Sequence, residues 1–249
     1  MIQSRRIWLV GKAAAELAPA VAWLREHARC ERAGIPSAIV VLQSRPGEFP
    51  QDQIEALHRR APLARLIVLA GAWCEGELRS GKPAHGVTRI LWHQWRERLP
   101  RELEATPLPR TTSDVESLLR AIPRQAEAQR GLAAICTWRR ESFAALAEAC
   151  LVAGLQGVWQ PPEAPRVVDG ADVLLIDGWP SIAGRRLFAH QSIPAVLLLD
   201  WPRPEDVMRA AEQQIDRVLG QPMLLADLVA ALHDAIGGQA FVARRSAIA

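Results

Sequence analysis

The chain contains no tyrosine, and only two of its 30 basic residues, Lys12 and Lys82, are lysines. Its 27 acidic residues leave a formal net charge of only +3, and the arginines are spread along the sequence. A protein that binds nucleic acid usually concentrates its basic residues in one segment or on one face. We therefore expect no nucleic-acid partner.

Cysteine is also scarce, and the four cysteines show no C-x-x-C spacing. Cys30, Cys74, Cys136 and Cys150 lie in or beside apolar segments. Zinc sites and disulfide frameworks depend on characteristic spacings that this pattern does not show. The sequence predicts buried, reduced thiols, and it gives no reason to expect a metal or another cofactor.

Long apolar runs are missing as well, since none approaches the roughly 20 residues needed to span a bilayer. The first residues lead into a short strand-like run without the apolar core of a signal peptide. We expect a cytoplasmic protein with no membrane partner. Hydrophobic residues make up 49% and charged residues 23% of the 249 residues, which favours two folded domains with buried cores.

Short apolar runs alternate with segments of helical periodicity. Strands are predicted at 7–10, 38–42, 66–70, 88–92, 133–136, 173–176 and 195–199, and near Val158 and Val218. Helices are predicted at 13–28, 51–60 and 141–153, and from Thr112 or Ser113, where Glu116 completes a capping box. This alternation indicates a parallel sheet covered by helices.

The second half repeats the order of the first, and several residues recur at fixed separations. The matches are Cys30, Ala33 and Gly34 with Cys150, Ala153 and Gly154, 120 positions apart, and Trp73 with Trp179 and Trp95 with Trp201, 106 apart. The smaller separation predicts that the second copy lost the helix at 51–60, where Pro161, Pro162 and Pro165 now stand. We predict two tandem modules, residues 1–123 and 130–238, followed by a tail at 239–249.

Two segments of the second half carry a family resemblance. The run from Arg217 to Leu228, with Gln221-Pro222 between strand and helix, resembles the last strand, Lys-Pro turn and final helix of response-regulator receiver domains. The run from Ala171 to Pro180 resembles that family's third strand, and Asp177 stands at its phospho-acceptor position. The resemblance implies two-component signalling and two receiver-like modules of flavodoxin type, each a doubly wound parallel sheet.

The sequence departs from the family at the residues that support phosphorylation. Phosphoryl transfer to a carboxylate needs Mg²⁺ and positive charge to offset the charge of the phosphoryl oxygens. Where the family has an acidic pair after the first strand, this chain has Gly11-Lys12 and Thr137-Trp138, and Gln221 replaces the lysine before the turn proline. Asp177 is therefore predicted to be a vestigial phospho-acceptor.

The first copy departs further. Its acceptor position is predicted at Gly71, its fourth strand to end at His93-Gln94, and its turn to be Leu108-Pro109. The second copy has Leu199-Asp200 after its fourth strand.

The loop from Gly71 to Gly86 combines a thiol, carboxylates and an imidazole after a buried strand, where doubly wound folds place ligand crevices. A Cys74 nucleophile with His85 as base, beside Glu75 and Glu77, defines an alternative enzyme or small-ligand site. No orienting group or oxyanion donor can be named, and the glycines fit no nucleotide-binding fingerprint. We therefore expect no catalytic residues and no enzymatic activity.

Nine tryptophans are unusual beside the absence of tyrosine, and several fall at predicted strand ends. Trp73, Trp95, Trp179 and Trp201 are the interaction candidates, because tryptophan is enriched at binding hot spots. The other interpretation is that the tryptophans fill the crevice that phosphate and metal would otherwise occupy.

The leading hypothesis is a non-catalytic signalling or scaffolding protein. It would act through unidentified protein partners, with self-association into a homo-oligomer left open, and independently of aspartate phosphorylation. The alternatives are a ligand-binding protein or enzyme using the loop from Gly71 to Gly86, and a response regulator that is still phosphorylated on Asp177.

Overall fold

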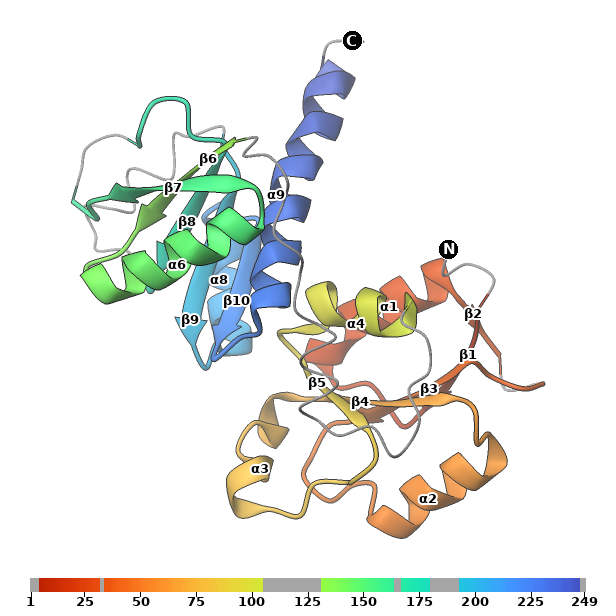
Figure 1. Cartoon of the computed structure of the whole chain (residues 1–249). Helices are drawn as coiled ribbons and strands as arrows, with labels where there is room; N and C mark the ends of the chain where they lie inside the picture. The colour runs from red at the N-terminus through yellow and green to blue at the C-terminus, as the bar shows by residue number, and fades with distance from the viewer. Residues whose placement is uncertain (1–4, 32–33, 105–130, 164–166, 180–192, 247–249) are drawn as a thin grey trace. The chain divides into compact units, whose positions relative to one another are not determined.

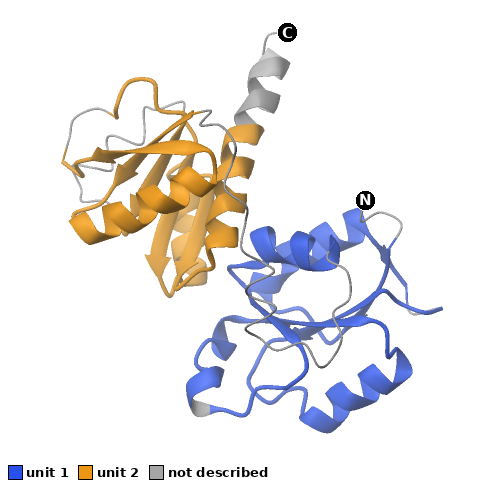
Figure 2. Cartoon of the chain, in the orientation of Figure 1, with its two compact units in different colours: residues 1–116 blue, residues 117–249 orange. Residues whose placement is uncertain are grey.

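The computed structural model describes residues 5–31, 34–104, 131–163, 167–179 and 193–246. The chain divides into two compact units, Met1–Glu116 and Ser117–Ala249 (Figure 2). The expected linker at 124–129 and the expected helix from Thr112 lie outside the described residues.

The first unit contains a five-stranded parallel sheet with the order β2-β1-β3-β4-β5 (Figure 1). Its strands are β1 (Arg6–Val10), β2 (Arg29–Cys30), β3 (Ala38–Gln43), β4 (Arg65–Ala70) and β5 (Thr88–Leu91). Every residue of β3 is buried. Parallel strands covered on both faces need such continuous apolar runs, which explains why periodicity alone located the central strands.

Helices cover both faces of this sheet. They are α1 (Ala18–His27), α2 (Gln51–Arg60), the short α3 (Glu77–Ser80) and α4 (Trp95–Glu104), with 3₁₀ turns at Ala15–Leu17 and Ala72–Cys74. In Figure 1, α1 and α4 lie on one face and α2 and α3 on the other. Ile54 of α2 packs on Ile39, Val41 and Val68, which points α2 at the β3–β4 face.

The second unit contains a second five-stranded parallel sheet. Its strands are β6 (Gly131–Cys136), β7 (Leu155–Gln160), β8 (Val173–Asp177), β9 (Ala195–Asp200) and β10 (Arg217–Gln221). The order is β7-β6-β8-β9-β10, the same as in the first unit.

Three described helices cover the second sheet: α6 (Arg140–Val152), α8 (Pro204–Glu212) and α9 (Leu225–Ser246). Leu146 of α6 and Leu232 of α9 share one core cluster with Ile135 and Leu175. Ala210 of α8 packs against the opposite face. Helix α9 continues to Ser246, into the segment that we assigned to the tail.

The predicted fold class is confirmed, because both units are doubly wound parallel sheets of flavodoxin type with one strand order. The registers also define equivalent positions. Val10 pairs with Val41 as Cys136 pairs with Ile176, so the next residue in β3, Leu42, corresponds to Asp177.

One strand of the first unit was missed, and this shifts every later assignment there. The two-residue strand β2 follows α1 directly, so β3 is the third strand and not the second. Two residues are too short to produce a hydrophobic pattern. The fifth strand is β5, which ends at Leu91, and the predicted turn at Leu108-Pro109 lies outside the described residues.

The residue matches that suggested the repeat are wrong, although the two units do share their topology. Cys30 lies in β2, whereas Cys150 lies in α6. The tryptophans differ likewise: Trp73 follows β4, the fourth strand of its unit, and Trp179 follows β8, a third strand. Small and aromatic residues recur at the ends of buried elements, so such matches arise without equivalence.

The last pair of the repeat fails in the same way. Trp95 begins α4 after the fifth strand, whereas Trp201 follows β9, a fourth strand.

The predicted loss of a helix is also misplaced. Helix α2 joins the third and fourth strands of the first unit, whereas most of the corresponding connection in the second unit, between β8 and β9, lies outside the described residues. Pro161 and Pro162 instead lie between the second and third strands, which the first unit joins through 31–37.

Within the described ranges, no helix is long and apolar enough to cross a bilayer.

Candidate functional site

The carboxyl ends of the strands form the edge where doubly wound sheets bind ligands. In the second unit this edge carries Asp177 as the last residue of β8, with Thr137 directly after β6. The register places Thr137 opposite Asp177, because Cys136 pairs with Ile176. Thr137 and Trp138 thus follow the strand next to β8, at the place where the sequence analysis put the counterpart of the family's acidic pair.

Three side chains contact the Asp177 carboxylate, whose side chain is only 9% exposed. The Thr137 hydroxyl donates to Oδ2 at 2.8 Å, and the Gln221 amide donates to Oδ1 at 3.3 Å. The guanidinium of Arg139, which is largely exposed, lies 3.8 Å from Oδ2. Both carboxylate oxygens therefore already have donors from this chain.

Thr137 is itself held in place. Its hydroxyl accepts a hydrogen bond from the backbone N–H of Arg139 at 3.2 Å, and its carbonyl accepts one from the Trp159 indole at 3.0 Å. Below it, burial and the nearby Asp177 charge raise the pKa of the Cys136 thiol to about 11. Cys136 is thus a neutral thiol at physiological pH.

A cavity of about 320 Å³ opens beside Asp177. Its lining is mainly polar and aromatic: Thr137, Trp138, Arg139, Asp177, Gly178, Trp179, Leu198, Asp200 and Gln221. Among the described residues, the exposed Asp200 carboxylate has no hydrogen-bonding or ion-pairing partner. The cavity thus contains one carboxylate that already accepts hydrogen bonds, Asp177, and one that has no partner among the described residues, Asp200.

Two tryptophans, Trp138 and Trp179, line this cavity, and two others, Trp159 and Trp201, lie next to lining residues. Trp138 is 60% exposed, Trp201 48% and Trp159 45%, while Trp179 is half-buried. The Trp179 indole donates to Asp206 Oδ1 at 3.2 Å, and the guanidinium of Arg209 lies 4.6 Å from the centre of its ring. Trp138 and Trp179 therefore line the cavity without filling it.

The same edge of the first unit is closed. Leu42, not Gly71, stands at the position of Asp177, and it is buried. β4 and β5 pair Ala70 with Leu91 as β9 and β10 pair Leu199 with Gly220, so Trp92 and His93, and not the predicted Leu108-Pro109, correspond to Gln221 and Pro222. Trp92 is 5% exposed.

Trp92 and His93 anchor the loop beside them. The Trp92 indole donates to Glu75 Oε1 at 2.7 Å, and His93 Nε2 lies 3.7 Å from the same oxygen. Burial, with a smaller effect of the Arg98 guanidinium, lowers the pKa of His93 to about 4. Burial raises the pKa of Glu75, and the hydrogen bond from Trp92 partly opposes this.

A buried ion pair fills the space next to β3. Glu77 is 3% exposed and accepts hydrogen bonds from Gln43, at 3.0 and 3.2 Å, and from the backbone N–H of Gly47 at 3.1 Å. The Arg89 guanidinium donates to Glu77 Oε2 at 2.6 Å. Glu77 thus connects α3 to β3 and β5, and these contacts give it a role in stability.

The proposed pairing of Cys74 with His85 does not occur in the structure. The Cys74 thiol is fully buried and donates to the Gln43 carbonyl at 3.5 Å. Its pKa is raised, chiefly by burial, which disfavours the thiolate that a nucleophile needs. His85 is exposed, and its backbone N–H donates to Gln51 of α2.

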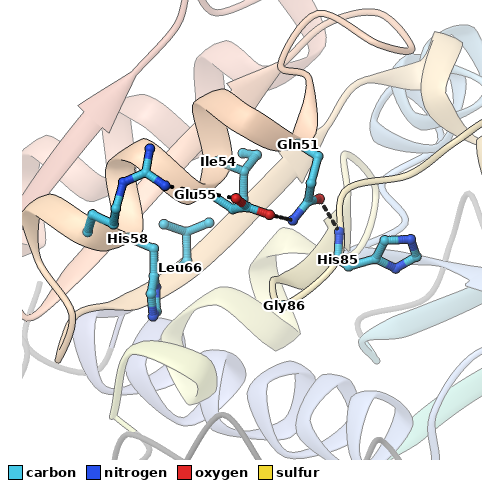
Figure 3. A pocket seen from close by; sticks show the side chains of 8 residues that line it. Gln51, Ile54, Glu55, His58, Leu66, His85 and Gly86 are labelled. Atoms are coloured by element: carbon cyan, nitrogen blue, oxygen red, sulfur yellow. Dashed lines mark hydrogen bonds and ion pairs between the residues drawn. The ribbon is translucent and has the colours of Figure 1, made fainter.

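His85 instead borders a separate groove of about 510 Å³ between α2 and the end of the Gly71–Gly86 loop (Figure 3). The groove is lined by Gln51, Ile54, Glu55, His58, Arg59, Leu66, His85 and Gly86. In Figure 3, Gln51 bridges Glu55 and the backbone of His85, while His58 lies toward the other end of the helix. Cys74, Glu75 and Glu77 are not among the residues that line it.

The interaction candidates are scattered. Trp73 follows β4 and is 78% exposed. The ring centre of Trp95 lies 6.2 Å from that of Trp23 on α1. Trp179 and Trp201 lie at the edge of the second sheet.

Sequence reasoning missed Gln43 and Arg89, the partners of Glu77. A signal was present, since both are polar residues at or within otherwise apolar strands. Across the ranges that the structure describes, no group of three or more histidine, cysteine, aspartate or glutamate side chains is arranged to hold a metal ion.

No protein-family model matches the chain, and no curated protein matches it significantly. Among solved structures, it is similar to the signal receiver domain of a signal transduction histidine kinase from Syntrophus aciditrophicus, with 18% identity and a TM-score of 0.36 over 44% of this chain and 92% of that chain.

Two further similarities extend over nearly the whole chain. One is to a probable two-component system response regulator/GGDEF domain protein, with 12% identity and a TM-score of 0.39 over 95% of this chain and 99% of that chain. The other is to the C-terminus of RcsC from E. coli, which contains a linker region and a phosphoreceiver domain, with 16% identity and a TM-score of 0.34 over 98% and 96%. All three TM-scores are below 0.5, so no argument is built on these similarities, and the functional argument rests on the residues of this chain.

Proposed function

We propose that the protein is a non-catalytic signalling or scaffolding protein made of two degenerate receiver modules, which works through contacts with other proteins and without aspartate phosphorylation. The observation that carries this proposal is the set of donors around Asp177. Thr137, Gln221 and Arg139 occupy the surroundings that an acceptor would offer to a phosphoryl group and its metal.

The residues at the edge of the second sheet do not fit Mg²⁺. The metal prefers several hard oxygen ligands, usually more than one carboxylate, in an octahedral arrangement. The acidic-pair positions hold a hydroxyl that donates to Asp177 and an indole, and Gln221 supplies a neutral amide where positive charge would stabilise phosphoryl oxygens. Asp200 adds one carboxylate, which leaves the ligand set incomplete.

The first unit supports the same conclusion more strongly. Leu42 has no group that can accept a phosphoryl, and Trp92 is buried at the position of Gln221. A module closed in this way can still present surfaces to a partner.

The test is intact-mass measurement after incubating the full chain with acetyl phosphate and Mg²⁺, beside a phosphorylation-competent receiver domain as positive control. We expect no added phosphoryl group and no Mg²⁺-dependent rise in melting temperature. An added phosphoryl that is absent from Asp177→Asn would refute the proposal and restore a phospho-switch.

A second candidate function is small-ligand binding at the groove of Figure 3. Its volume of about 510 Å³ falls in the range of small-molecule pockets, and Arg59 and His85 line it with nitrogen groups that suit a polar ligand. A thermal-shift screen of small anions tests this function. Stabilisation that is lost in the double variant Arg59→Ala, His85→Ala would favour it over the scaffold.

A further inference from the structure

The cavity beside Asp177 has a second kind of chemistry. Two indoles, Trp138 and Trp179, line it together with the open Asp200 carboxylate. A carboxylate next to aromatic walls is the usual arrangement for binding an organic cation, which gains charge pairing and cation–π attraction at once. The volume of about 320 Å³ lies at the lower end of the range for small-molecule pockets.

The charge of the cavity also favours a cation. Asp177 accepts hydrogen bonds from two neutral donors, Thr137 and Gln221, and lies 3.8 Å from the Arg139 guanidinium, so its carboxylate already has partners within the chain. Asp200 has no such partner among the described residues, which leaves one uncompensated negative charge in the lining. An anionic ligand would be repelled by the Asp200 carboxylate, whereas a cationic ligand would be attracted to it.

The chain's own arginines indicate which cation fits. Arg209 stacks over Trp179 with its guanidinium 4.6 Å from the ring centre, and Arg139 approaches the carboxylate of Asp177. A planar guanidinium can stack on an indole and donate two hydrogen bonds to a carboxylate, whereas an ammonium group cannot stack. Guanidinium groups of this chain therefore already make both kinds of contact at this edge, stacking on an indole and approaching a carboxylate.

The surroundings favour a polypeptide over a free small molecule. The Trp159 indole donates to the carbonyl of Thr137 and Trp201 directly follows Asp200, so two further tryptophans lie next to lining residues, and they remain 45% and 48% exposed. Large aromatic side chains around one central pocket are typical of protein-binding hot spots.

We propose that this cavity binds an arginine side chain of a partner protein, with the guanidinium on Asp200 between Trp138 and Trp179. The inference rests on the proposed function in one respect: it identifies the class of partner for the same edge of the second unit. Asp177 forms the wall of the cavity and does not pair with the incoming arginine.

The experiment uses the full chain labelled with ¹⁵N, so that the indole N–H signals of Trp138 and Trp179, assigned with Trp→Phe variants, report binding. The probe is a Gly-Ser peptide with one central arginine, compared with identical peptides carrying lysine or the neutral isostere citrulline. We expect the arginine peptide to shift both signals, and the citrulline peptide to bind at least about tenfold more weakly.

Two pairs of variants locate the site. Asp200→Asn and Trp138→Ala should each weaken binding of the arginine peptide by about tenfold. The matched controls Asp169→Asn and Trp73→Ala change exposed residues outside the cavity and should leave binding unchanged. Asp177→Asn should change the affinity for the arginine peptide by no more than about twofold, because both carboxylate oxygens of Asp177 already accept hydrogen bonds within the chain.

Several results would overturn the inference. They are equal binding of the arginine and citrulline peptides, equal binding of the lysine peptide, and equal binding to wild type and Asp200→Asn. If blocked arginine amide binds as tightly as the peptide, the site serves a free small molecule and the assignment to a partner protein is wrong. The proposed function is judged separately by phosphorylation, so phosphorylated Asp177 with intact peptide binding would refute that function alone.

Discussion

The two units share one strand order but differ at the functional edge of the sheet. In the first unit the edge is filled: Leu42, Trp92 and His93 are buried there, and Glu77 is neutralised by Arg89 beneath the loop. In the second unit the edge holds a cavity with one saturated and one open carboxylate. The topology fixes where a site can form, and the side chains that follow the strands decide whether one does.

The largest effect on the free energy of unfolding should come from removing the charge of Glu77 in the first unit. In the first unit, Glu77→Gln leaves the Arg89 guanidinium, only 13% exposed, without its counter-charge. We expect a loss of about 3 kcal/mol in the free energy of unfolding, since breaking a buried ion pair strands a charge in the interior. Urea unfolding of the full chain, followed by circular dichroism, measures it. A loss below about 1 kcal/mol would mean that Arg89 finds other partners.

The buried imidazole of the first unit should make that unit sensitive to acid. His93 has a pKa of about 4 in the folded chain against an ordinary value near 6.5, so between these values the unfolded chain binds a proton that the folded chain does not. Stability should therefore fall as the pH falls from about 6.5 to about 4, by up to about 3 kcal/mol at the acid end. The raised pKa of Glu75 acts in the opposite direction and reduces the net change.

The measurement for His93 is the melting temperature of wild type and His93→Phe across this pH window. The variant should lose part of the acid sensitivity, whereas His85→Asn, a change at an exposed histidine, should keep all of it. Identical pH profiles for wild type and His93→Phe would show that the pKa of His93 does not differ between the folded and the unfolded chain.

The smallest effect is expected from the matched change in the second unit. Asp177→Asn keeps an oxygen that can accept from Thr137, and the ion pair it removes involves Arg139, whose side chain is 68% exposed. Exposed pairs contribute little, so we expect a change of at most about 1 kcal/mol. Urea unfolding of Asp177→Asn beside Glu77→Gln compares the two edges directly. Equal losses would mean that both edges are held by buried charge.

The comparison also shows how far the sequence could predict the molecule. Continuous apolar runs such as 38–42 and 66–70 located the central strands, because a strand buried on both faces must be apolar throughout. Two tandem doubly wound sheets followed from the alternation of elements. The two-residue β2 left no such signal, and its omission placed Gly71 where the sheet has Leu42.

Within the site, the sequence by itself determined chemical identity. It predicted that Thr137, Trp138 and Gln221 stand where the resemblance implies carboxylates and a lysine, and these residues lie at the ends of strands that the sequence located correctly. The tertiary structure decided which groups meet. It buried Cys74 away from His85, joined Glu77 to Arg89, and left Asp200 open beside two indoles. Such contacts depend on strand register and on how loops pack between elements distant in sequence, and hydrophobic periodicity carries no information about either.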